Sequence, residues 1–213
     1  MEITLPDGSS KILESGSTGY DLAKSIGSGL AKSAVAININ GENKDLFDKL
    51  PDNSSVSIIT IDSQDGLEIM RHTLTAQVLA KAIKNLYPDS KLAIGPTIEN
   101  GFYYDVSTEI PISIDDLPEI ENEMKRIIEK KSEIVKSLHS KKDAKKLFKE
   151  KKESFKIEII DDADQTEDFQ IYKNADEDFI DLCRGPHLPN LSFIGAFKLT
   201  KVSGAYWKLS LIH

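Results

Sequence analysis

The sequence predicts an α+β fold in two domains, and three observations lead to this prediction. The first sixty residues contain short β-branched runs and one helical segment, separated by turn residues. A polar, turn-rich break at Ser63–Gly66 follows, and beyond it the hydrophobic spacing becomes that of a long helix. In the remainder, strands and helices are grouped instead of alternating regularly. We therefore expect a small domain over residues 1–62 and a larger one over residues 63–213.

The small domain is expected to open with a β-hairpin that leads into a helix. Residues 1–5 alternate in polarity before a Pro-Asp-Gly turn, and residues 11–14 supply the return strand. Thr18 can cap the helix, with Asp21 three residues later, and Gly27 ends it. Two β-branched runs add buried strands at Val35–Ile39 and Val56–Ile61. Together these elements make a small β-grasp-like unit.

The larger domain is expected to pack one long helix against a mainly antiparallel sheet. The helix runs from about Leu67 to Leu86, is ended by Pro88, and carries apolar residues at helical intervals. Strand-like segments follow at residues 91–94, 102–106, 134–138, 155–160, 169–172, 179–182 and 197–202. Two further helices are expected at residues 114–131 and 141–151.

Composition and charge exclude several classes of protein. Hydrophobic residues at 39% and charged residues at 29% are ordinary for a globular chain, and no run approaches the roughly 20 apolar residues of a membrane span. The N-terminus lacks the pattern of a secretory leader, and the one cysteine, Cys183, cannot form an internal disulfide. A cytoplasmic protein without a membrane partner is therefore expected. The net charge of −8 also argues against a protein that coats DNA by bulk electrostatics.

The charge is nevertheless uneven along the chain. Residues 125–152 contain twelve Lys or Arg against four acidic residues. Such a run forms either a solvated helical face or a surface that contacts phosphates. The sequence leaves both interpretations open.

The residues from Asp181 to His187 could form a small chemical site. Cys183 and His187 lie four residues apart across a Gly-Pro bend, so a thiol and an imidazole can converge. This pair suits zinc binding or proton transfer, although a zinc site needs at least three protein ligands and a lone cysteine usually packs in the core. Asp181 precedes Cys183 by two residues on an expected strand and therefore projects from the same face. An acid, a thiol and an imidazole would then cluster.

Three other residues are candidates for the same site. His72, near the start of the long helix, either supplies a third group to this cluster or lies at the surface. Tyr104 lies in an aromatic segment that either lines a pocket for a nucleotide base or packs a hairpin. Lys156 alternates with apolar neighbours on an expected strand, so it would point away from the core, toward a phosphate, a carbonyl group or solvent.

Five stretches, taken in their order and spacing, give a more specific indication. They are Leu67–His72, Ile94–Pro96, Glu99–Asp105, Asp181–His187 and Gly204–Trp207. Through them, residues 1 to about 208 resemble the N-terminal part of bacterial threonyl-tRNA synthetases. The first sixty residues are similar to the ubiquitin-like TGS domain of that family, and the rest to its editing domain. The resemblance implies these two folds.

The resemblance also implies an activity. In this family the editing domain hydrolyses serine attached in error to tRNA(Thr), because the methyl group that serine lacks is worth only about 1–3 kcal/mol to a pocket for threonine. The implied partner is the acceptor end of tRNA(Thr), and a positioned water would attack the seryl ester, oriented by histidine and lysine. The matching pocket positions are His72, Lys156, Asp181, Cys183 and His187, with Tyr104 on the wall.

The long helix departs from the family pattern. The family has two histidines four residues apart, whereas here Gln77 stands five residues after His72. At about 100° per residue these side chains differ by roughly 140° around a regular helix, so without a local bulge they cannot share a pocket. If the later apolar residues set the register instead, Thr73 and Gln77 occupy the pocket positions and contact the substrate. A four-ligand zinc arrangement is likewise reduced to His72, Cys183 and His187 at best, and we expect no bound metal.

The sequence contains no ATP-binding motif, and it stops at His213, where the family continues into its catalytic core. ATP and zinc would belong to that core, so we expect this chain to need no cofactor and to be unable to attach threonine itself. Three hypotheses follow. The chain is a deacylase for seryl-tRNA(Thr), alone or with a separate or full-length synthetase; it is a tRNA-binding module without hydrolysis; or it is a truncated remnant of the synthetase.

Overall fold

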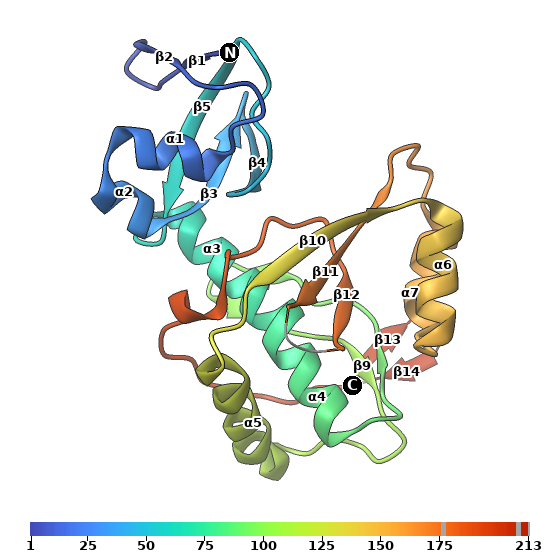
Figure 1. Ribbon diagram of the computed structural model, residues 1–213. Helices are drawn as coiled ribbons and strands as arrows, with labels where there is room; N and C mark the ends of the chain where they lie inside the picture. The colour runs from blue at the N-terminus through green and yellow to red at the C-terminus, as the bar shows by residue number, and fades with distance from the viewer. Residues whose placement is uncertain (176–177, 208–209, 213) are drawn as a thin grey trace.

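The computed structural model describes residues 1–175, 178–207 and 210–212. A small N-terminal domain lies next to a larger domain, and one long helix starts beneath the first and runs through the second (Figure 1). The predicted α+β fold is confirmed. No helix among the described residues is long and apolar enough to cross a membrane.

A five-stranded sheet and two helices form the N-terminal domain. The strands, in the order β2-β1-β5-β3-β4, are β1 (Glu2–Thr4), β2 (Ser10–Ile12), β3 (Ala34–Ile39), β4 (Glu42–Asp45) and β5 (Ser54–Thr60). β1 and β5 are parallel, and the other neighbours are antiparallel. The helices are α1 (Gly19–Ile26) and α2 (Ser28–Ser33). Leu22 of α1 packs with Ile3 and Ile37 of the sheet, which is the β-grasp arrangement; β4 and α2 are additions to the predicted elements.

The predicted start of α1 is confirmed. The Thr18 hydroxyl accepts from the Asp21 N–H at 3.3 Å, and the Asp21 carboxylate accepts from the Thr18 N–H at 2.9 Å. Gly19 follows because a Cβ at this position would lie 2.3 Å from Ile37 Cγ2. The missing side chain therefore lets α1 approach β3 closely.

The predicted long helix is confirmed, but it is not α-helical throughout. It consists of α3 (Gln64–Thr73), a π-helical segment η1 (Leu74–Leu79) and α4 (Ala80–Leu86). Ser63 caps α3 by accepting the Gly66 N–H at 3.0 Å. A Cβ on Gly66 would lie 2.1 Å from the Thr60 carbonyl oxygen, so glycine is required where the helix begins this close to β5.

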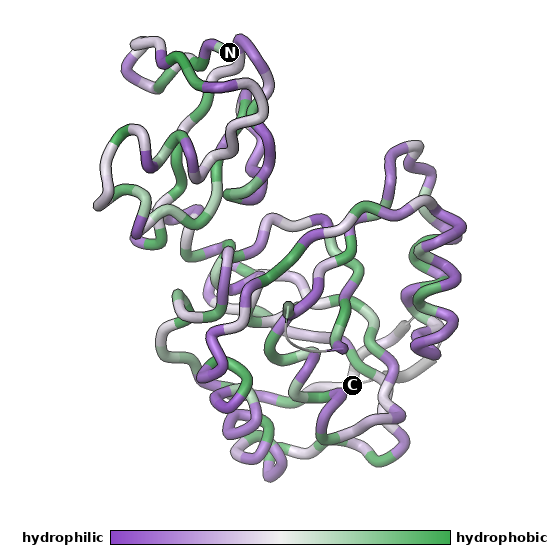
Figure 2. Tube along the Cα trace, in the orientation of Figure 1, coloured by the Kyte–Doolittle hydropathy of each residue, from purple (hydrophilic) through white to green (hydrophobic). Residues whose placement is uncertain are grey.

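A three-stranded antiparallel sheet lies against this helix in the larger domain. Its strands are β10 (Ile134–His139), β11 (Phe169–Asn174) and β12 (Ile180–Leu182). Helix α5 (Leu117–Glu129) packs against α4 and buries Ile120, Met124 and Ile127. Hydrophobic segments gather in this interior, whereas much of α5 and α6 (Lys141–Glu150) is hydrophilic (Figure 2).

Short elements complete the domain. Three two-stranded pairs are β6 (Lys91–Leu92) with β9 (Val106–Ser107), β7 (Thr97–Ile98) with β8 (Gly101–Phe102), and β13 (Ala205–Trp207) with β14 (Ser210–Ile212). Two 3₁₀ turns are η2 (Ile114–Asp116) and η3 (Leu191–Phe193). The loop between β8 and β9 carries Tyr104.

Two of the predicted strands are wrong. Residues 155–160 belong to helix α7 (Ser154–Asp162), which pairs with α6 at the side of the sheet (Figure 1). Phe148 of α6 and Ile160 of α7 share a core with Phe169 and Ile171 of β11, so packing against these residues holds the segment as a helix. Residues 197–202, all within the described part of the chain, form no strand. The Leu199 N–H donates at 2.8 Å to the Glu121 carboxylate on α5, so a side chain takes the place of a neighbouring strand.

Candidate functional site

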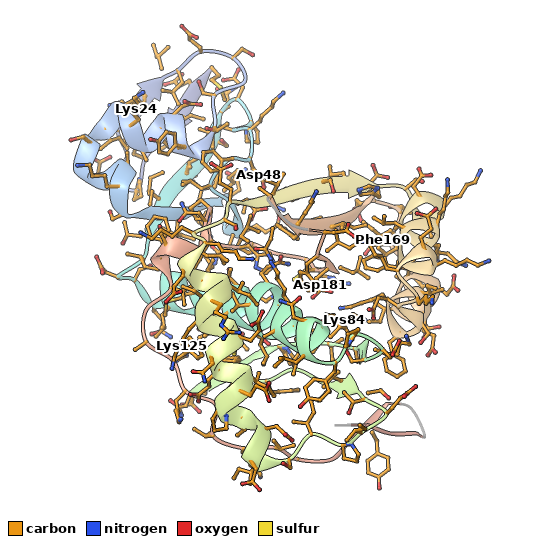
Figure 3. All side chains as sticks on the ribbon, turned by 60° about the horizontal axis from the view of Figure 1, so that its bottom comes forward. Lys24, Asp48, Lys84, Lys125, Phe169 and Asp181 are labelled. Carbon is orange, nitrogen blue, oxygen red and sulfur yellow. The ribbon has the colours of Figure 1, made fainter. Side chains whose placement is uncertain are left out.

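The predicted site residues come from elements that are far apart in the sequence. His72 and Thr73 lie on α3, Gln77 on η1, Lys156 on α7, Asp181 on β12, Cys183 and His187 in the loop after β12, and Tyr104 between β8 and β9. Figure 3 shows Asp181 in the interior of the larger domain, beside the long helix. Direct contacts join every one of these side chains except that of Gln77 into two groups.

His72 and Cys183 begin the first group. Cys183 Sγ lies 2.8 Å from His72 Nε2, and the Pro186 carbonyl oxygen lies 3.2 Å from His72 Nδ1. Because a carbonyl oxygen only accepts hydrogen bonds, Nδ1 carries the proton, and Nε2 accepts from the Cys183 thiol. Burial lowers the pKa of His72, and the Pro186 contact and the charge of Asp181 oppose this only in part. His72 is therefore a neutral imidazole near pH 7.

His187 completes this group, with its ring stacked on His72 at a centroid distance of 4.5 Å. The Thr73 hydroxyl donates to the Ile69 carbonyl at 2.9 Å, so it accepts from His187 Nδ1 at 3.1 Å. This contact places a proton on Nδ1, so in the neutral ring the lone pair is on Nε2. His187 Nε2 is buried and has no hydrogen-bond partner within the described part of the chain. Such a nitrogen can take a proton from a bound water.

The second group contains Lys156, for which the sequence-based expectation is wrong. Lys156 lies on a helix, and it points inward with only 2% of the residue exposed. Its Nζ lies 2.6 Å from Asp181 Oδ1 and 3.0 Å from the Tyr104 hydroxyl, which in turn donates to Asp181 Oδ2 at 3.0 Å. Helical spacing could have indicated this burial, because Lys156 precedes the fully buried Ile160 by four residues.

The Tyr104 hydroxyl and the Lys156 ammonium group act as hydrogen-bond donors in this group. Burial, followed by the neighbouring charge of Asp181, raises the pKa of Tyr104 far above its ordinary value, so its hydroxyl stays protonated. An ammonium group has three N–H donors, and contacts with described residues use two of those on Lys156. The third donor is available to a ligand oxygen.

Both helix registers that the sequence offers as alternatives place a residue in the site. One wider turn in the π-helical segment takes up the extra residue, His72 contacts Cys183, and Thr73 contacts His187. Gln77 lies in this segment and is fully buried. Its side-chain amide has no hydrogen-bond partner among the residues described. Its backbone carbonyl oxygen accepts from Asn174 Nδ2 at 3.1 Å.

The geometry of the first group bears on metal binding. One donor atom each from His72, Cys183 and His187 lies within 4.8 Å of the others, and zinc accepts this donor set. However, His72 Nε2 and Cys183 Sγ are only 2.8 Å apart, whereas two ligands of one tetrahedral zinc ion lie roughly 3.5 Å apart. The spacing is that of a hydrogen bond, and the absence of a bound metal stays a prediction.

Replacing His72 by glutamine is expected to make the unfolding free energy less dependent on pH. The folded chain holds the pKa of His72 below its ordinary value of about 6.5, which the unfolded chain retains. Between these two values the unfolded state binds more protons, so the unaltered chain loses stability as the pH falls through 6.5, and this loss ends below the folded-state pKa. Urea unfolding from about pH 5 to 8 measures the difference. Equal pH slopes for both chains would contradict a buried, neutral His72.

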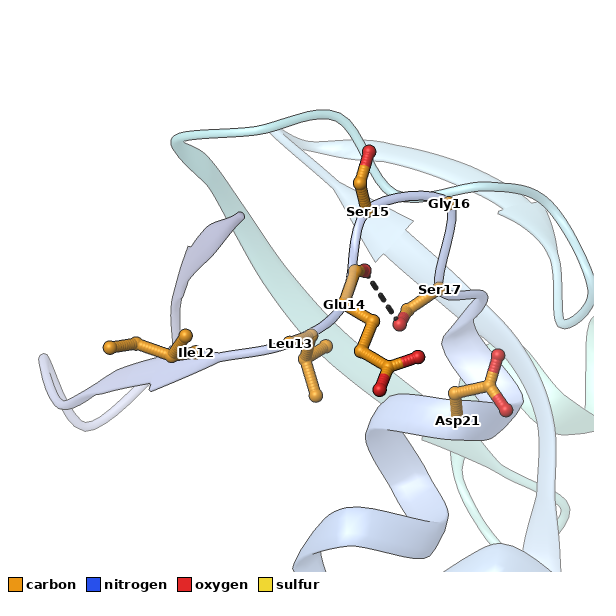
Figure 4. Close-up of a pocket in the computed structure, with 7 residues that line it drawn as sticks. All are labelled: Ile12, Leu13, Glu14, Ser15, Gly16, Ser17 and Asp21. Carbon is orange, nitrogen blue, oxygen red and sulfur yellow. Dashed lines mark hydrogen bonds between the residues drawn. The ribbon is translucent and has the colours of Figure 1, made fainter.

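One surface hollow lies away from these two groups, and another lies beside His187. One lies in the N-terminal domain around residues 12–17 and Asp21, where the Ser17 hydroxyl donates to the Glu14 carbonyl at 2.8 Å (Figure 4). None of the candidate residues lines it. The other, of about 440 Å³, opens between the domains and is lined by Asp45, Tyr172 and His187, among others. Sequence analysis missed Tyr172, whose ring packs edge-on against His187 at a centroid distance of 4.4 Å; no spacing pattern marks such a contact.

Comparisons with known proteins identify similar domains and relatives for most of the chain. Residues 1–60 match the TGS domain, and residues 170–206 match the threonyl and alanyl tRNA synthetase second additional domain. Threonine–tRNA ligases of Acetivibrio thermocellus and Bartonella bacilliformis are each 44% identical to this chain over 98% of its length, and that of Citrifermentans bemidjiense is 46% identical over 98%. The chain matches the N-terminal part of threonine–tRNA ligases. The resemblance read from the sequence is thereby confirmed.

The match covers only part of each threonine–tRNA ligase. The chain spans about a third of the length of these relatives, namely 32% of the A. thermocellus protein, 31% of the B. bacilliformis protein and 32% of the C. bemidjiense protein. Within the chain, the segment that matches the second additional domain contains three of the candidate site residues, Asp181, Cys183 and His187.

Proposed function

We propose that the two groups of side chains around His187 and Lys156 hydrolyse the ester bond of seryl-tRNA(Thr), as the editing part of a threonine–tRNA ligase. The observation that supports this most strongly is the state of His187, with its tautomer fixed and its buried Nε2 left without a described protein partner. The spare donor on the buried Lys156 ammonium is a second support. A base and a cationic donor are the two groups that ester hydrolysis by water requires.

In the proposed reaction a water attacks the carbonyl carbon of the seryl ester and gives a proton to His187 Nε2. Lys156 stabilises the negative charge that develops on the carbonyl oxygen. The bond to the ribose oxygen then breaks, that oxygen takes the proton from His187, and serine and tRNA are released. Thr73 holds the His187 ring, Tyr104 and Asp181 hold Lys156, and the buried Gln77 amide is available to bind the serine moiety.

The proposed reaction consumes only water. It therefore needs no ATP. We also assign no zinc to this chain, because His72 Nε2 and Cys183 Sγ are spaced as hydrogen-bond partners. The RNA partner is the acceptor end of tRNA(Thr), and a separate or full-length threonyl-tRNA synthetase would supply the charged tRNA in the cytoplasm.

Release of serine from seryl-tRNA(Thr) by the purified chain tests this function. Threonyl-tRNA(Thr) is the control substrate, because it carries the same tRNA and differs by one methyl group. Faster release of serine than of threonine is the expected result. No release above the rate of spontaneous hydrolysis, with tRNA still bound, would reject the deacylase and favour a binding module.

The lysine-rich helix α6 supports tRNA binding whether the chain is a deacylase or a binding module. Several lysines of the basic run have protein partners, for example Lys145 with Asp161 at 2.6 Å and Lys151 with Asp178. Four lysines of α6 are exposed. Lys141 donates to the Asp161 and Ala163 carbonyl oxygens, and the other three are Lys142, Lys146 and Lys149. The run is therefore partly a set of structural ion pairs and partly a surface that a phosphate backbone can reach.

Replacing Lys142, Lys146 and Lys149 together by alanine is expected to weaken tRNA binding and to reduce the salt dependence of the affinity. The slope of log K against log salt is negative, and each phosphate that the variant no longer neutralises makes it less steep by roughly 0.7–0.9. Titrations of tRNA at several salt concentrations measure this slope. The triple variant at Lys24, Lys32 and Lys49 removes three exposed charges from the N-terminal domain and is the matched control. Equal slopes for the α6 variant and the unaltered chain would exclude α6 from the tRNA surface.

A further inference from the structure

Asp45, the last residue of β4 in the N-terminal domain, reaches into the larger domain. Its Oδ1 accepts the backbone N–H of His187 at 2.8 Å, and its Oδ2 accepts the Tyr172 hydroxyl at 2.7 Å. Lys136 of β10 lies 2.8 Å from the same Oδ2 and also pairs with Asp48. Figure 3 shows Asp48 at the edge of the N-terminal domain that faces the larger one. One carboxylate thus joins two strands and one loop of the larger domain.

These contacts fall on the loop that carries the proposed base. Gly185 has a φ of +64°, and a Cβ there would lie 2.0 Å from the Tyr172 hydroxyl oxygen, so the loop is pressed against that hydroxyl. The Tyr172 ring supports the His187 ring from the side. His187 is therefore held at three points: Nδ1 by Thr73, the ring by Tyr172, and the backbone N–H by Asp45.

Low exposure to solvent strengthens these contacts of Asp45. The Asp45 side chain is only 14% exposed, and the Lys136 side chain 21%, so water competes weakly for their charges. Burial alone would lower the pKa of Lys136, yet Asp45 and Asp48 raise it above the ordinary value. A hydrogen bond from an N–H to such a carboxylate is shorter and stronger than one between neutral groups.

We propose that Asp45 is a positioning residue for the hydrolytic site, through which the N-terminal domain sets the place of His187. The inference rests on the proposed function for its kinetic consequence, but the contact itself can be tested apart from activity. It makes the N-terminal domain a component of the hydrolytic site. A base displaced by about 1 Å from its working position loses on the order of a hundredfold in rate.

The kinetic test compares Asp45→Ala with Asp48→Ala in the full chain. Asp48 is a matched control, because it binds the same Lys136 across the same boundary but contacts neither His187 nor Tyr172. Its Oδ2 also accepts the Asp45 backbone N–H at 3.3 Å, a contact that does not involve the Asp45 carboxylate. Asp45→Ala is expected to lower kcat for seryl-tRNA(Thr) hydrolysis by about 10- to 100-fold, as removal of supporting groups does at other sites, with KM unchanged. Asp48→Ala should stay within about twofold of the unaltered chain. An equal fall in both variants, or none in Asp45→Ala, would overturn the proposal.

A spectroscopic test does not depend on hydrolysis. The backbone N–H of His187 should give a downfield proton resonance because it donates to a carboxylate. Asp45→Ala is expected to move this resonance upfield, and Asp48→Ala to leave it in place. A resonance that does not move in Asp45→Ala would refute the contact, whereas a chain that shows the shift but releases no serine would refute only the proposed function.

A third variant covers the case that Asp45→Ala does not fold. Asp45→Glu keeps the charge and can still pair with Lys136, but the extra methylene moves the carboxylate away from its place beside His187. The same loss of kcat and the same displacement of the His187 resonance are expected. Full activity with an unmoved resonance in Asp45→Glu would show that charge alone matters and would overturn a positioning role.

Discussion

Replacing His187 by alanine is expected to lower kcat for seryl-tRNA(Thr) hydrolysis by about 10²- to 10⁴-fold and to leave tRNA affinity almost unchanged. The variant loses the buried Nε2 that takes the proton of the attacking water, and it loses no exposed positive surface. Single-turnover hydrolysis at saturating enzyme measures the chemical step, and a separate titration with uncharged tRNA measures binding.

His139→Ala is the matched control for this variant. His139 lies at the end of β10 and contacts Ser137, so the same side chain is removed outside the pocket. Its hydrolysis rate should equal that of the unaltered chain. If His187→Ala instead weakens tRNA binding while hydrolysis at saturation stays intact, His187 is a binding residue and the proposed base must be sought elsewhere.

Replacing Lys156 by methionine is expected to abolish hydrolysis and to destabilise the fold. The side chains of Lys156 and Asp181 are 3% and 2% exposed, so the variant leaves a buried carboxylate without its counter-charge. Removal of one partner of such a pair costs about 3–5 kcal/mol of unfolding free energy. Urea unfolding measures this cost, and single-turnover hydrolysis below the unfolding transition measures the loss of activity.

Two further variants separate the structural effect from the chemical one. Lys145→Met breaks the exposed pair with Asp161, whose side chains are 41% and 47% exposed, and should cost no more than about 1 kcal/mol. Adding Asp181→Leu to Lys156→Met removes the uncompensated charge, so stability should largely return while hydrolysis stays absent. Recovery of hydrolysis in this double variant would exclude Lys156 from the reaction.

The fold was predictable wherever short-range chemistry decides the structure. The Thr18–Asp21 capping box, the β-branched runs of the first domain and the apolar spacing of the long helix each act within a few residues. The wrong strand at residues 155–160 shows the limit of this approach. Alternation and helical spacing agree over so short a run, and the partner that decides between them, Phe148, lies on another helix.

The candidate site was predictable only in part. Cys183 and His187 were indicated by the bend between them, and His72 by the resemblance, but the inward direction of Lys156 depended on the helix that the strand prediction missed. The sequence required a bulge for His72 and Gln77 to share a pocket but could not show one, because π-helical turns have no marker as specific as a capping residue. Asp45 could not be predicted, because its contacts cross between domains over more than a hundred residues of sequence.

The π-helical segment has a consequence for how this chain is aligned with others. An extra residue within Leu74–Leu79 is taken up by one wide turn, so the faces that α3 and α4 present are both preserved. The same insertion within α3 or α4 would rotate everything beyond it by about 100° and would exchange buried for exposed positions. An alignment gap in this helix therefore belongs in that turn. In that turn a lineage could gain or lose a residue of the helix without exchanging a residue of the site for one of the core.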